Sequence, residues 1–250
     1  MCFPYDAHPP IAPIAGAAVD SEDLTLEASD GNRFAAFAAR SGNSNAPGIV
    51  VLPDVRGLFR FYEELALRFA EQGMNSIAFD YFGRTAGVAK RGEDFPYQEH
   101  VAQARPESIA ADVAASVSYL RSAQGGESGP IFSIGFCFGG SNSWMQAVED
   151  HGLSGAIGFY GRPVRRWDDT PGPTESVERF KCPILGLMAG DDAMITLDQV
   201  DEYKKALERA GVEHDVTVYP GAPHSFFDRT YEEHAEASAD AWRRVLEFIN

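Results

Sequence analysis

The sequence has few cysteines, few basic residues and no long hydrophobic run. Of its 250 residues, 3 are cysteines, and 21 Lys and Arg stand against 37 Asp and Glu, which gives a net charge of −16. Cysteines that are odd in number and far apart argue against a disulfide framework. The cysteines and histidines also lack the spacing of a zinc site, so we expect no metal and no other cofactor.

These shortages also limit the partners of the protein. A surface with this excess of acid repels phosphate backbones, which argues against binding of nucleic acids. No apolar run reaches the roughly 20 residues that cross a bilayer, and residues 1–6 do not begin like a signal peptide. We therefore expect a cytoplasmic protein, monomeric or homodimeric, that binds neither nucleic acid nor membrane.

Short apolar runs and amphipathic segments alternate along most of the chain. Residues 1–20 are rich in Pro and Ala and are expected to form an extended arm. Residues 24–27 and 34–37 flank Asp30-Gly31, which predicts an antiparallel β-hairpin. The other apolar runs predict strands at residues 48–52, 76–79, 131–134, 156–159, 184–188 and 216–219. Amphipathic segments predict helices at residues 61–72, 107–123, 141–149 and 196–210, and from Thr230 to the end.

This alternation predicts the fold class. Such a chain forms a mainly parallel α/β sheet with helices on both faces, here extended by the N-terminal hairpin. We expect residues 21–250 to form a single domain. Ligands of open α/β sheets bind beyond the carboxyl ends of the strands, so the loops at residues 83–106 and 161–179 are candidate walls of a pocket.

The segment from Gly135 to Gly139, with sequence Gly-Phe-Cys-Phe-Gly, lies between a predicted strand and a predicted helix. A chain that reverses from strand to helix at one residue is crowded, which requires glycine two positions to each side. The residue at the tip, Cys137, then projects above the sheet, and the amide of Phe138 lies at a helix N-terminus where it can stabilise an oxyanion. The spacing favours a nucleophilic thiol, and the alternative is a buried cysteine in a glycine-rich turn.

Two later segments carry groups that assist a nucleophile. Asp192 follows the strand predicted at residues 184–188, and His224 follows the last predicted strand. Nucleophile, acid and histidine occur in this chain order in hydrolases of this fold, so Cys137, Asp192 and His224 are predicted as nucleophile, orienting acid and base. Taken alone, Asp192 is also typical of a turn or helix start, and His224 of an ordinary loop.

These motifs resemble the dienelactone hydrolase family of α/β-hydrolases. The resemblance rests on residues 135–139 with Asp192 and His224, and it extends to residues 51–58, 79–84 and 223–226. It implies the α/β-hydrolase fold and a Cys-His-Asp triad. Through a thioester intermediate, such a triad would cleave a small lactone or ester, here one that carries a carboxylate.

The resemblance also implies roles for residues outside the triad. The amide of Val55 would be the second oxyanion donor beside that of Phe138. Arg84 would hold the carboxylate of the substrate, and Arg229 would share that task. Asp54 stands where well-known members have a glutamate that hydrogen-bonds the nucleophile, so we expect it to modulate the thiol. The alternative is that Asp54 caps the turn after its strand.

Two other functions fit the same residues. A general carboxylesterase or thioesterase would use the same triad without a preference for dienelactones. A non-catalytic redox sensor would use an exposed Cys137 as a switch. Because such a sensor needs neither Asp192 nor His224, the hydrolase accounts for more of the sequence.

Overall fold

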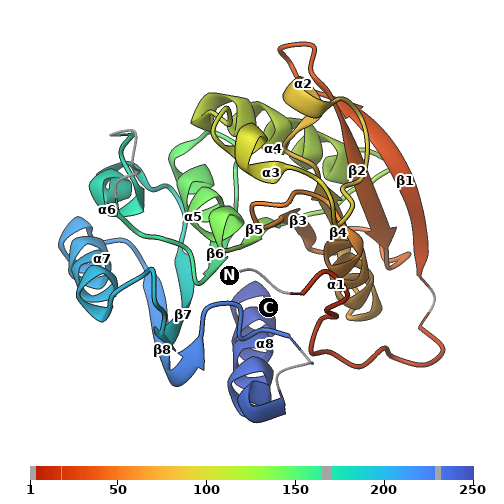
Figure 1. Cartoon of the computed structure of the whole chain (residues 1–250). Coiled ribbons are helices and arrows are strands. Elements are labelled where there is room, and N and C mark those ends of the chain that lie inside the picture. The colour runs from red at the N-terminus through yellow and green to blue at the C-terminus, as the bar shows by residue number, and fades with distance from the viewer. Residues whose placement is uncertain (1–3, 18, 165–169, 229–231) are drawn as a thin grey trace.

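A sheet of eight strands runs through the molecule. The computed structural model describes residues 4–17, 19–164, 170–228 and 232–250. In these residues the strand order is β1-β2-β4-β3-β5-β6-β7-β8, and helices lie on both faces of the sheet (Figure 1). The strands are β1 (Asp20–Glu27), β2 (Arg33–Arg40), β3 (Gly48–Leu52), β4 (Asn75–Phe79), β5 (Ile131–Phe136), β6 (Gly155–Phe159), β7 (Ile184–Asp191) and β8 (His214–Pro223).

The pairing of the strands confirms the predicted fold class. The strands from β4 to β8 along this order are parallel to their neighbours, whereas β2 pairs antiparallel with both β1 and β4. The hairpin continues four residues further than predicted, to the pair Asp20 and Arg40. Backbone hydrogen bonds extend β1 at this exposed edge of the sheet, where no apolar pattern marks the strand.

The helices agree with the amphipathic segments except near the loops. They are α1 (Arg60–Glu71), α2 (Gly83–Ala86), α3 (Tyr97–Val101), α4 (Pro106–Arg121), α5 (Phe138–Met145), α6 (Pro173–Ser176), α7 (Leu197–Ala210) and α8 (Ala235–Ile249), with short 3-10 turns at Gln146–Val148, Val177–Arg179 and Glu232–His234. Helix α5 begins three residues before the prediction, because its first turn contains two glycines and no apolar periodicity. The predicted helix start at Thr230 lies outside the described residues. None of the helices described here is long and apolar enough to cross a membrane.

Both faces of the central strands are buried. Ile49 and Val51 of β3 pack in a cluster with residues of α1 and α8. Val50 and Leu52, which alternate with them, pack in a second cluster with residues of α4. Such two-sided burial accounts for the continuous apolar runs of the parallel strands, and it leaves the loops at the strand ends as the place for polar chemistry.

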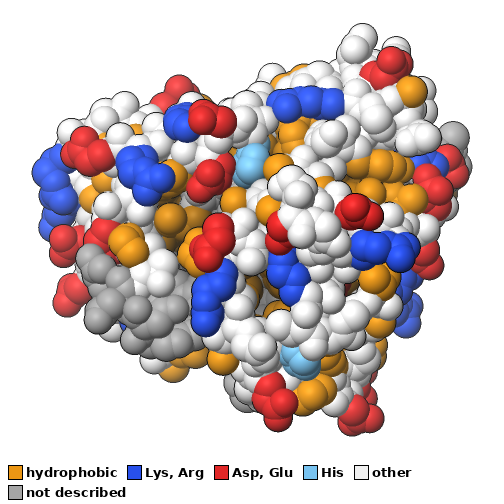
Figure 2. All heavy atoms as spheres, turned by 90° about the horizontal axis from the view of Figure 1, so that it is seen from above, with side chains coloured by type: hydrophobic (Ala, Val, Ile, Leu, Met, Phe, Trp, Pro, Cys, Tyr) orange, Lys and Arg blue, Asp and Glu red, His pale blue; other side chains and the backbone are white. Residues whose placement is uncertain are grey.

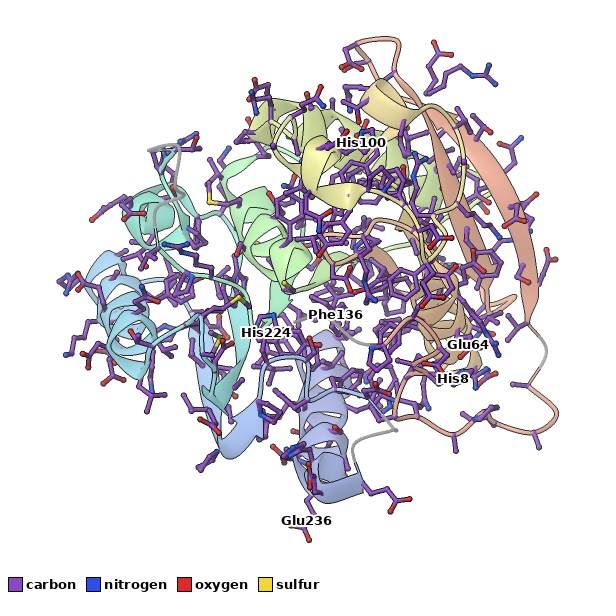
Figure 3. The ribbon with its side chains drawn as sticks, in the orientation of Figure 1. His8, Glu64, His100, Phe136, His224 and Glu236 are labelled. Carbon is purple, nitrogen blue, oxygen red and sulfur yellow. The ribbon has the colours of Figure 1, made fainter. Side chains whose placement is uncertain are left out.

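The N-terminal segment packs against the loop that follows β3. The ring of Tyr5 stacks on Phe59, with 5.5 Å between the ring centroids, and the Tyr5 hydroxyl donates to the carbonyl oxygen of Arg91 at 3.1 Å. Ala7 is fully buried in the core, and His8 contacts Glu64 of α1 at 2.6 Å (Figure 3). Residues 4–8 are therefore tied to the body of the protein.

Candidate active site

The carboxyl ends of four neighbouring strands bring together the predicted site residues. Cys137 directly follows β5, and Tyr160 directly follows β6. Asp192 and His224 directly follow β7 and β8. Because β5, β6, β7 and β8 are parallel neighbours, these four residues share one edge of the sheet. A cavity of about 220 Å³ at this edge is lined by Cys137, Tyr160 and His224, among others.

The backbone at Cys137 is strained in the way that the glycine spacing predicts. Its φ is 56° and its ψ is −115°, a conformation that costs a non-glycine residue about 1–3 kcal/mol. A Cβ atom on Gly135 would lie 1.9 Å from the carbonyl oxygen of Gly139, and one on Gly139 would lie 2.1 Å from that of Leu52. The amide of Cys137 donates to the carbonyl oxygen of Phe159 at 3.0 Å, which fixes the turn to β6.

Asp192 and His224 form a buried pair. Nδ1 of His224 lies 2.6 Å from Oδ2 of Asp192, and the two side chains are 7% and 1% exposed. The second oxygen of Asp192 accepts hydrogen bonds from the amides of Met194 and Ile195. Burial raises the pKa of Asp192, but these bonds and the contact with His224 lower it further, so the net pKa is below its ordinary value. The carboxylate is therefore ionised and fixes the orientation of the imidazole.

The other side of the imidazole interacts with the thiol of Cys137. Nε2 of His224 is buried and has no hydrogen-bond partner of regular geometry in the described part of the chain. Burial alone lowers the pKa of His224, but the contacts with Asp192 and Cys137 outweigh it and raise the pKa to about 9. At neutral pH the ring therefore carries a proton that it can share with the sulfur.

Two further residues of unusual backbone geometry lie beside this pair. Tyr160 has a φ of 36° and Ser225 a φ of 64°, and the ring centroid of Tyr160 lies 4.9 Å from that of His224. Strained backbone persists only where the surroundings enforce it, and it gathers at functional sites. Of the non-glycine residues with positive φ in the described ranges, Cys137, Tyr160 and Ser225 lie at this edge.

The two amides that were predicted to bind an oxyanion both belong to residues of the cavity wall. Val55 and Phe138 line the same cavity as Cys137. Phe138 is the first residue of α5, where the backbone amide has no partner within the helix. Neither amide donates a hydrogen bond to any residue that the structure describes. The amides are thus available to a ligand.

Asp54 is buried in the turn after β3, where it binds Arg56. Its Oδ1 accepts from the amide of Arg56 at 2.8 Å and from Nε at 3.1 Å, and its Oδ2 accepts from Nη2 at 2.6 Å. The amide of Asp54 donates to the hydroxyl of Tyr62 at 2.9 Å. These contacts agree with the alternative that Asp54 caps the turn after β3. Val55 lies between Asp54 and Arg56 in the sequence, so the same contacts hold the backbone on either side of it.

The arginine that was predicted to bind the substrate is engaged elsewhere. Arg84 contacts Asp30 at 2.8 Å and Asp112 at 2.6 Å, and it is not among the described residues that line the cavity. Arg229, the predicted helper, lies outside the described residues. Arg162, on the loop after β6, lines the cavity instead.

Sequence reasoning had named this loop as a pocket wall but had not singled out Arg162 or Tyr160. Only their position in the chain could have pointed to the site. Both follow closely after the carboxyl end of the buried strand β6, where ligands of open α/β sheets bind. Nothing in their residue types distinguished them from other surface arginines or core tyrosines.

Cys182 and His100 lie outside the lining of this cavity. Cys182 is buried, and burial raises the pKa of its thiol to about 11, whereas Cys2 lies outside the described residues. His100 stacks on Phe95 and contacts Thr85 at 2.9 Å, well apart from His224 in Figure 3. In the residues described, no group of three or more His, Cys, Asp and Glu could hold a metal ion.

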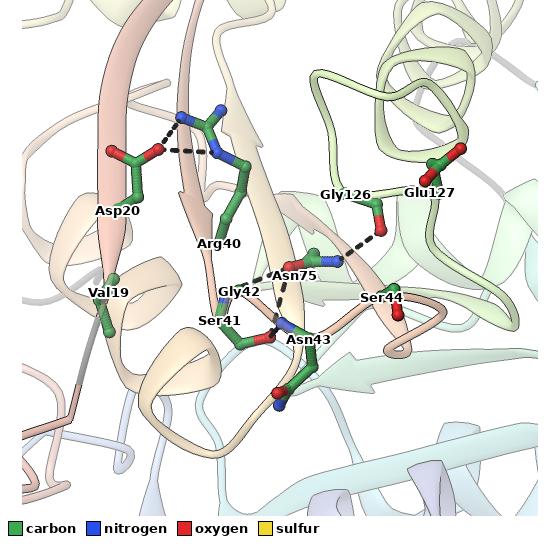
Figure 4. A pocket seen from close by; sticks show the side chains of 10 residues that line it. All are labelled: Val19, Asp20, Arg40, Ser41, Gly42, Asn43, Ser44, Asn75, Gly126 and Glu127. Atoms are coloured by element: carbon green, nitrogen blue, oxygen red, sulfur yellow. Dashed lines mark hydrogen bonds and ion pairs between the residues drawn. The ribbon is translucent and has the colours of Figure 1, made fainter.

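A second, larger cavity of about 500 Å³ lies at the opposite edge of the sheet, near the amino ends of the parallel strands (Figure 4). Its wall includes Arg40 and Asn75. Asn75 bonds to Ser41 and Ser128, and Arg40 pairs with Asp20. The protein itself therefore uses the side chains of Arg40 and Asn75.

Comparison with known proteins gives consistent matches over nearly the whole chain. Residues 34–250 match the model of the dienelactone hydrolase family. An Escherichia coli (strain K12) protein named "Putative carboxymethylenebutenolidase" is 28% identical over 254 aligned residues, which cover 96% of this chain and 93% of that protein. A Saccharolobus solfataricus protein of the same name is 30% identical, over 88% of this chain and 95% of its own length.

Solved structures give the same result for the fold. A structure titled as a putative dienelactone hydrolase from Klebsiella pneumoniae superposes with a TM-score of 0.81 at 25% identity, covering 93% of this chain and 98% of that one. An esterase from Pyrococcus furiosus gives a TM-score of 0.68 at 14% identity, over 96% and 99% of the two chains. At that identity the likeness concerns the fold alone.

Proposed function

Because this chain belongs to the dienelactone hydrolase family of ester hydrolases, we propose that it cleaves small lactones or esters with Cys137 as nucleophile, His224 as acid and base, and Asp192 as the group that orients the imidazole. One observation carries the proposal. His224 has Asp192 at 2.6 Å on Nδ1, and the ring also interacts with the thiol of Cys137. This is the set of contacts that a nucleophile, a base and its orienting acid require.

The first half of the reaction transfers the acyl group to sulfur. The thiolate of Cys137 attacks the carbonyl carbon, and the carbonyl oxygen becomes an oxyanion. The amides of Val55 and Phe138 then donate to that oxygen, and one such donor contributes about 3–4 kcal/mol. As the carbon–oxygen bond breaks, the leaving alkoxide or enolate takes the proton from Nε2 of His224, and a thioester remains.

The second half releases the acid and restores the enzyme. Neutral His224 accepts a proton from water, and the oxygen of that water attacks the thioester carbon. The carbon–sulfur bond breaks, the thiolate of Cys137 leaves, and the product is a carboxylic acid. A thiolate is a weak base and expels enolates and phenolates more readily than amines, which favours esters and enol lactones over peptides. No cofactor is needed for these steps.

We assign Asp54 to the shape of the oxyanion loop. Its three contacts with Arg56 and the bond between its amide and Tyr62 span Val55, so they hold the peptide whose amide faces the substrate. The role first expected for Asp54, modulation of the thiol, predicts a different effect of substitution and can be separated from this one by experiment. Arg84 would have to leave Asp30 and Asp112 to bind a substrate carboxylate.

The test is the hydrolysis of dienelactone and aryl esters by Cys137→Ala and Cys137→Ser. We expect the alanine variant to lose turnover by several orders of magnitude, because the nucleophile is absent. Cys182→Ala is the matched control, since it removes a buried thiol that no step uses. Undiminished hydrolysis by Cys137→Ala would end the proposal. Mass spectrometry of the wild type with a slow ester should detect the acyl group on Cys137.

The apolar residues of the cavity wall favour one alternative within the same fold. Val55, Phe138, Met145 and Ile195 would equally suit a general carboxylesterase, in which case neutral esters would be cleaved as fast as anionic ones. A redox sensor predicts stoichiometric labelling of Cys137 without turnover. The oligomeric state and the cytoplasmic location stay predictions.

A further inference from the structure

The wall of the cavity beside Cys137 is mainly apolar. Its apolar members come from the loops after β3, β6 and β7 and from α4, α5 and α6, and they include Val55, Pro106, Phe138, Met145, Val164, Pro171, Pro173, Met194 and Ile195. Met194 is 55% exposed, so the apolar surface continues to the rim. Figure 2, seen from above the view of Figure 1, shows hydrophobic side chains exposed between charged ones on that face of the molecule. A ligand with an apolar body fits such a wall.

Two polar side chains of the wall are used by the protein itself. Ser141 donates to the carbonyl oxygen of Arg162 at 2.8 Å. Asn142 donates to that of Phe138 at 2.8 Å. Both side chains therefore hold the backbone around the cavity.

Arg162 differs from the other arginines near the site. Arg56 is paired with Asp54, Arg91 with Asp80, and Arg84 with two carboxylates. Arg162 is exposed, and its guanidinium has no hydrogen bond or ion pair with any part of the chain that the structure describes. Among the described residues that line the cavity, Arg162 is the arginine, and the protonated His224 beside Asp192 is a second cation.

The net charge of the whole protein makes an unpaired arginine near the thiol important for anionic ligands. With a net charge of −16, the protein repels anions from most of its surface. A guanidinium without a carboxylate partner binds a carboxylate through two parallel hydrogen bonds. An anionic ligand that reaches the thiol therefore meets, besides the imidazolium of His224 that Asp192 already pairs, the guanidinium of Arg162 on the cavity wall, which no described residue pairs.

We propose that Arg162 is a specificity-determining residue that binds a carboxylate on the ester or lactone substrate, while the apolar wall holds the rest of its acyl chain. This inference rests on the proposed function, since it names the substrate class of the same site. It assigns the carboxylate to the loop after β6 and leaves Arg84 as a structural arginine between Asp30 and Asp112.

The first test compares two esters that differ by one charge: para-nitrophenyl hydrogen adipate and its methyl ester. We expect the wild type to prefer the anionic ester, with a preference that weakens as salt is added. Arg162→Gln should lower the ratio of the two kcat/KM values about 10- to 100-fold, mainly through KM for the anionic ester. Arg162→Lys should retain part of the preference. Arg179→Gln, which removes one exposed charge outside the cavity wall, should leave the ratio unchanged.

The second test needs no turnover. Iodoacetate and iodoacetamide alkylate a thiol by the same reaction and differ in charge, so the ratio of their rates at Cys137 reports the local field. Arg162→Gln should lower the rate with iodoacetate and leave that with iodoacetamide almost unchanged. Peptide mass spectrometry identifies the alkylated cysteine, and Arg179→Gln again controls for net charge.

The outcomes separate this inference from the proposed function. If both ratios in Arg162→Gln stay within twofold of the wild type, the inference is wrong, and hydrolysis that still depends on Cys137 would leave the proposed function intact. A loss of the anionic preference in Arg84→Gln alone would return the role to Arg84. If Cys137→Ala hydrolyses the neutral ester as fast as the wild type, the proposed function fails, and the alkylation ratios still decide whether Arg162 attracts anions.

Discussion

The two cavities at opposite edges of the sheet differ in what their polar groups do. The larger one, about 500 Å³ near the amino ends of the parallel strands, is lined by Arg40 and Asn75, which bond to neighbouring protein groups. The smaller one, about 220 Å³ at the carboxyl ends, contains His224, whose Nε2 is buried without a partner of regular geometry in the described residues. The combination of a histidine and a thiol in one lining, rather than volume, distinguishes the candidate site.

The arginines of the two cavity walls also differ. At the amino edge, Arg40 binds Asp20, Glu22 and the hydroxyl of Tyr119, so its charge is neutralised within the protein. At the carboxyl edge, Arg162 has no such carboxylate among the described residues. The comparison teaches that an arginine is informative about ligands only when its contacts are known.

We expect the largest loss of activity when the orientation of His224 is disturbed. In Asp192→Asn the ring loses its charged partner on Nδ1, and the wrong tautomer can form. We expect kcat for aryl esters to fall by about two to four orders of magnitude. Asp191→Asn is the matched control, because Asp191 is adjacent and exposed. Equal activity of the two variants would contradict the role of Asp192.

The same variant tests the proton on His224 through stability. Because the folded pKa is raised to about 9 from 6.5, the contribution of this group is fully present below pH 6.5 and is lost as the pH rises through about 9. Because Cys137 supplies part of the rise, the free energy of unfolding of the wild type should exceed that of Asp192→Asn by about 1–3 kcal/mol near pH 6. Denaturant titrations from pH 6 to pH 10 should show this difference shrinking; a constant difference would exclude a raised pKa.

At the amino-edge cavity the expected effect is on stability alone. Asn75→Ala removes bonds to Ser41 and Ser128 from a buried position, which should cost about 1–3 kcal/mol of unfolding free energy. The value of kcat/KM measured well below the unfolding temperature should not change. Asn43→Ala, an exposed residue of the same wall, should have little effect on either quantity. A loss of turnover in folded Asn75→Ala would show that this edge also serves catalysis.

We expect a smaller loss of kcat when Asp54, in the loop that carries Val55, is changed. Asp54→Asn keeps an oxygen that can accept from the amide of Arg56 but removes the ion pair. If Asp54 shapes the loop, kcat should fall about tenfold, less than the loss of a whole oxyanion donor, and iodoacetamide should alkylate Cys137 at the wild-type rate. A changed alkylation rate would instead support direct modulation of the thiol.

Local signals in the sequence predicted most of the elements and the sharp turn at Cys137. The glycines beside Cys137 are required by contacts under 2.2 Å that any Cβ would make, so the turn could be read from residue spacing. The parallel strands were visible because both of their faces are buried and apolar. The strand β1 and the start of α5 were placed less well, since edge pairing and a glycine-containing first turn leave no apolar pattern.

The arginines show the limit of sequence reasoning most clearly. Arg84 was expected in the site from the motif around it, yet two carboxylates from distant segments, Asp30 and Asp112, hold it. Likewise, Asp54 was matched to a position in a family, but its neighbour Arg56 occupies both of its oxygens. Charge pairing depends on which side chains meet in space, and sequence position does not report this.

By itself, the sequence determined the alternation of buried strands and amphipathic helices and the sharp turn at Cys137, because burial and steric crowding act on neighbouring residues. Only the tertiary structure decided which side chains would meet: that His224 lies 2.6 Å from Asp192, that Arg84 is neutralised, and that Arg162 lines the cavity. Such contacts join residues that are far apart in the chain, and their strength depends on distance and on exclusion of water.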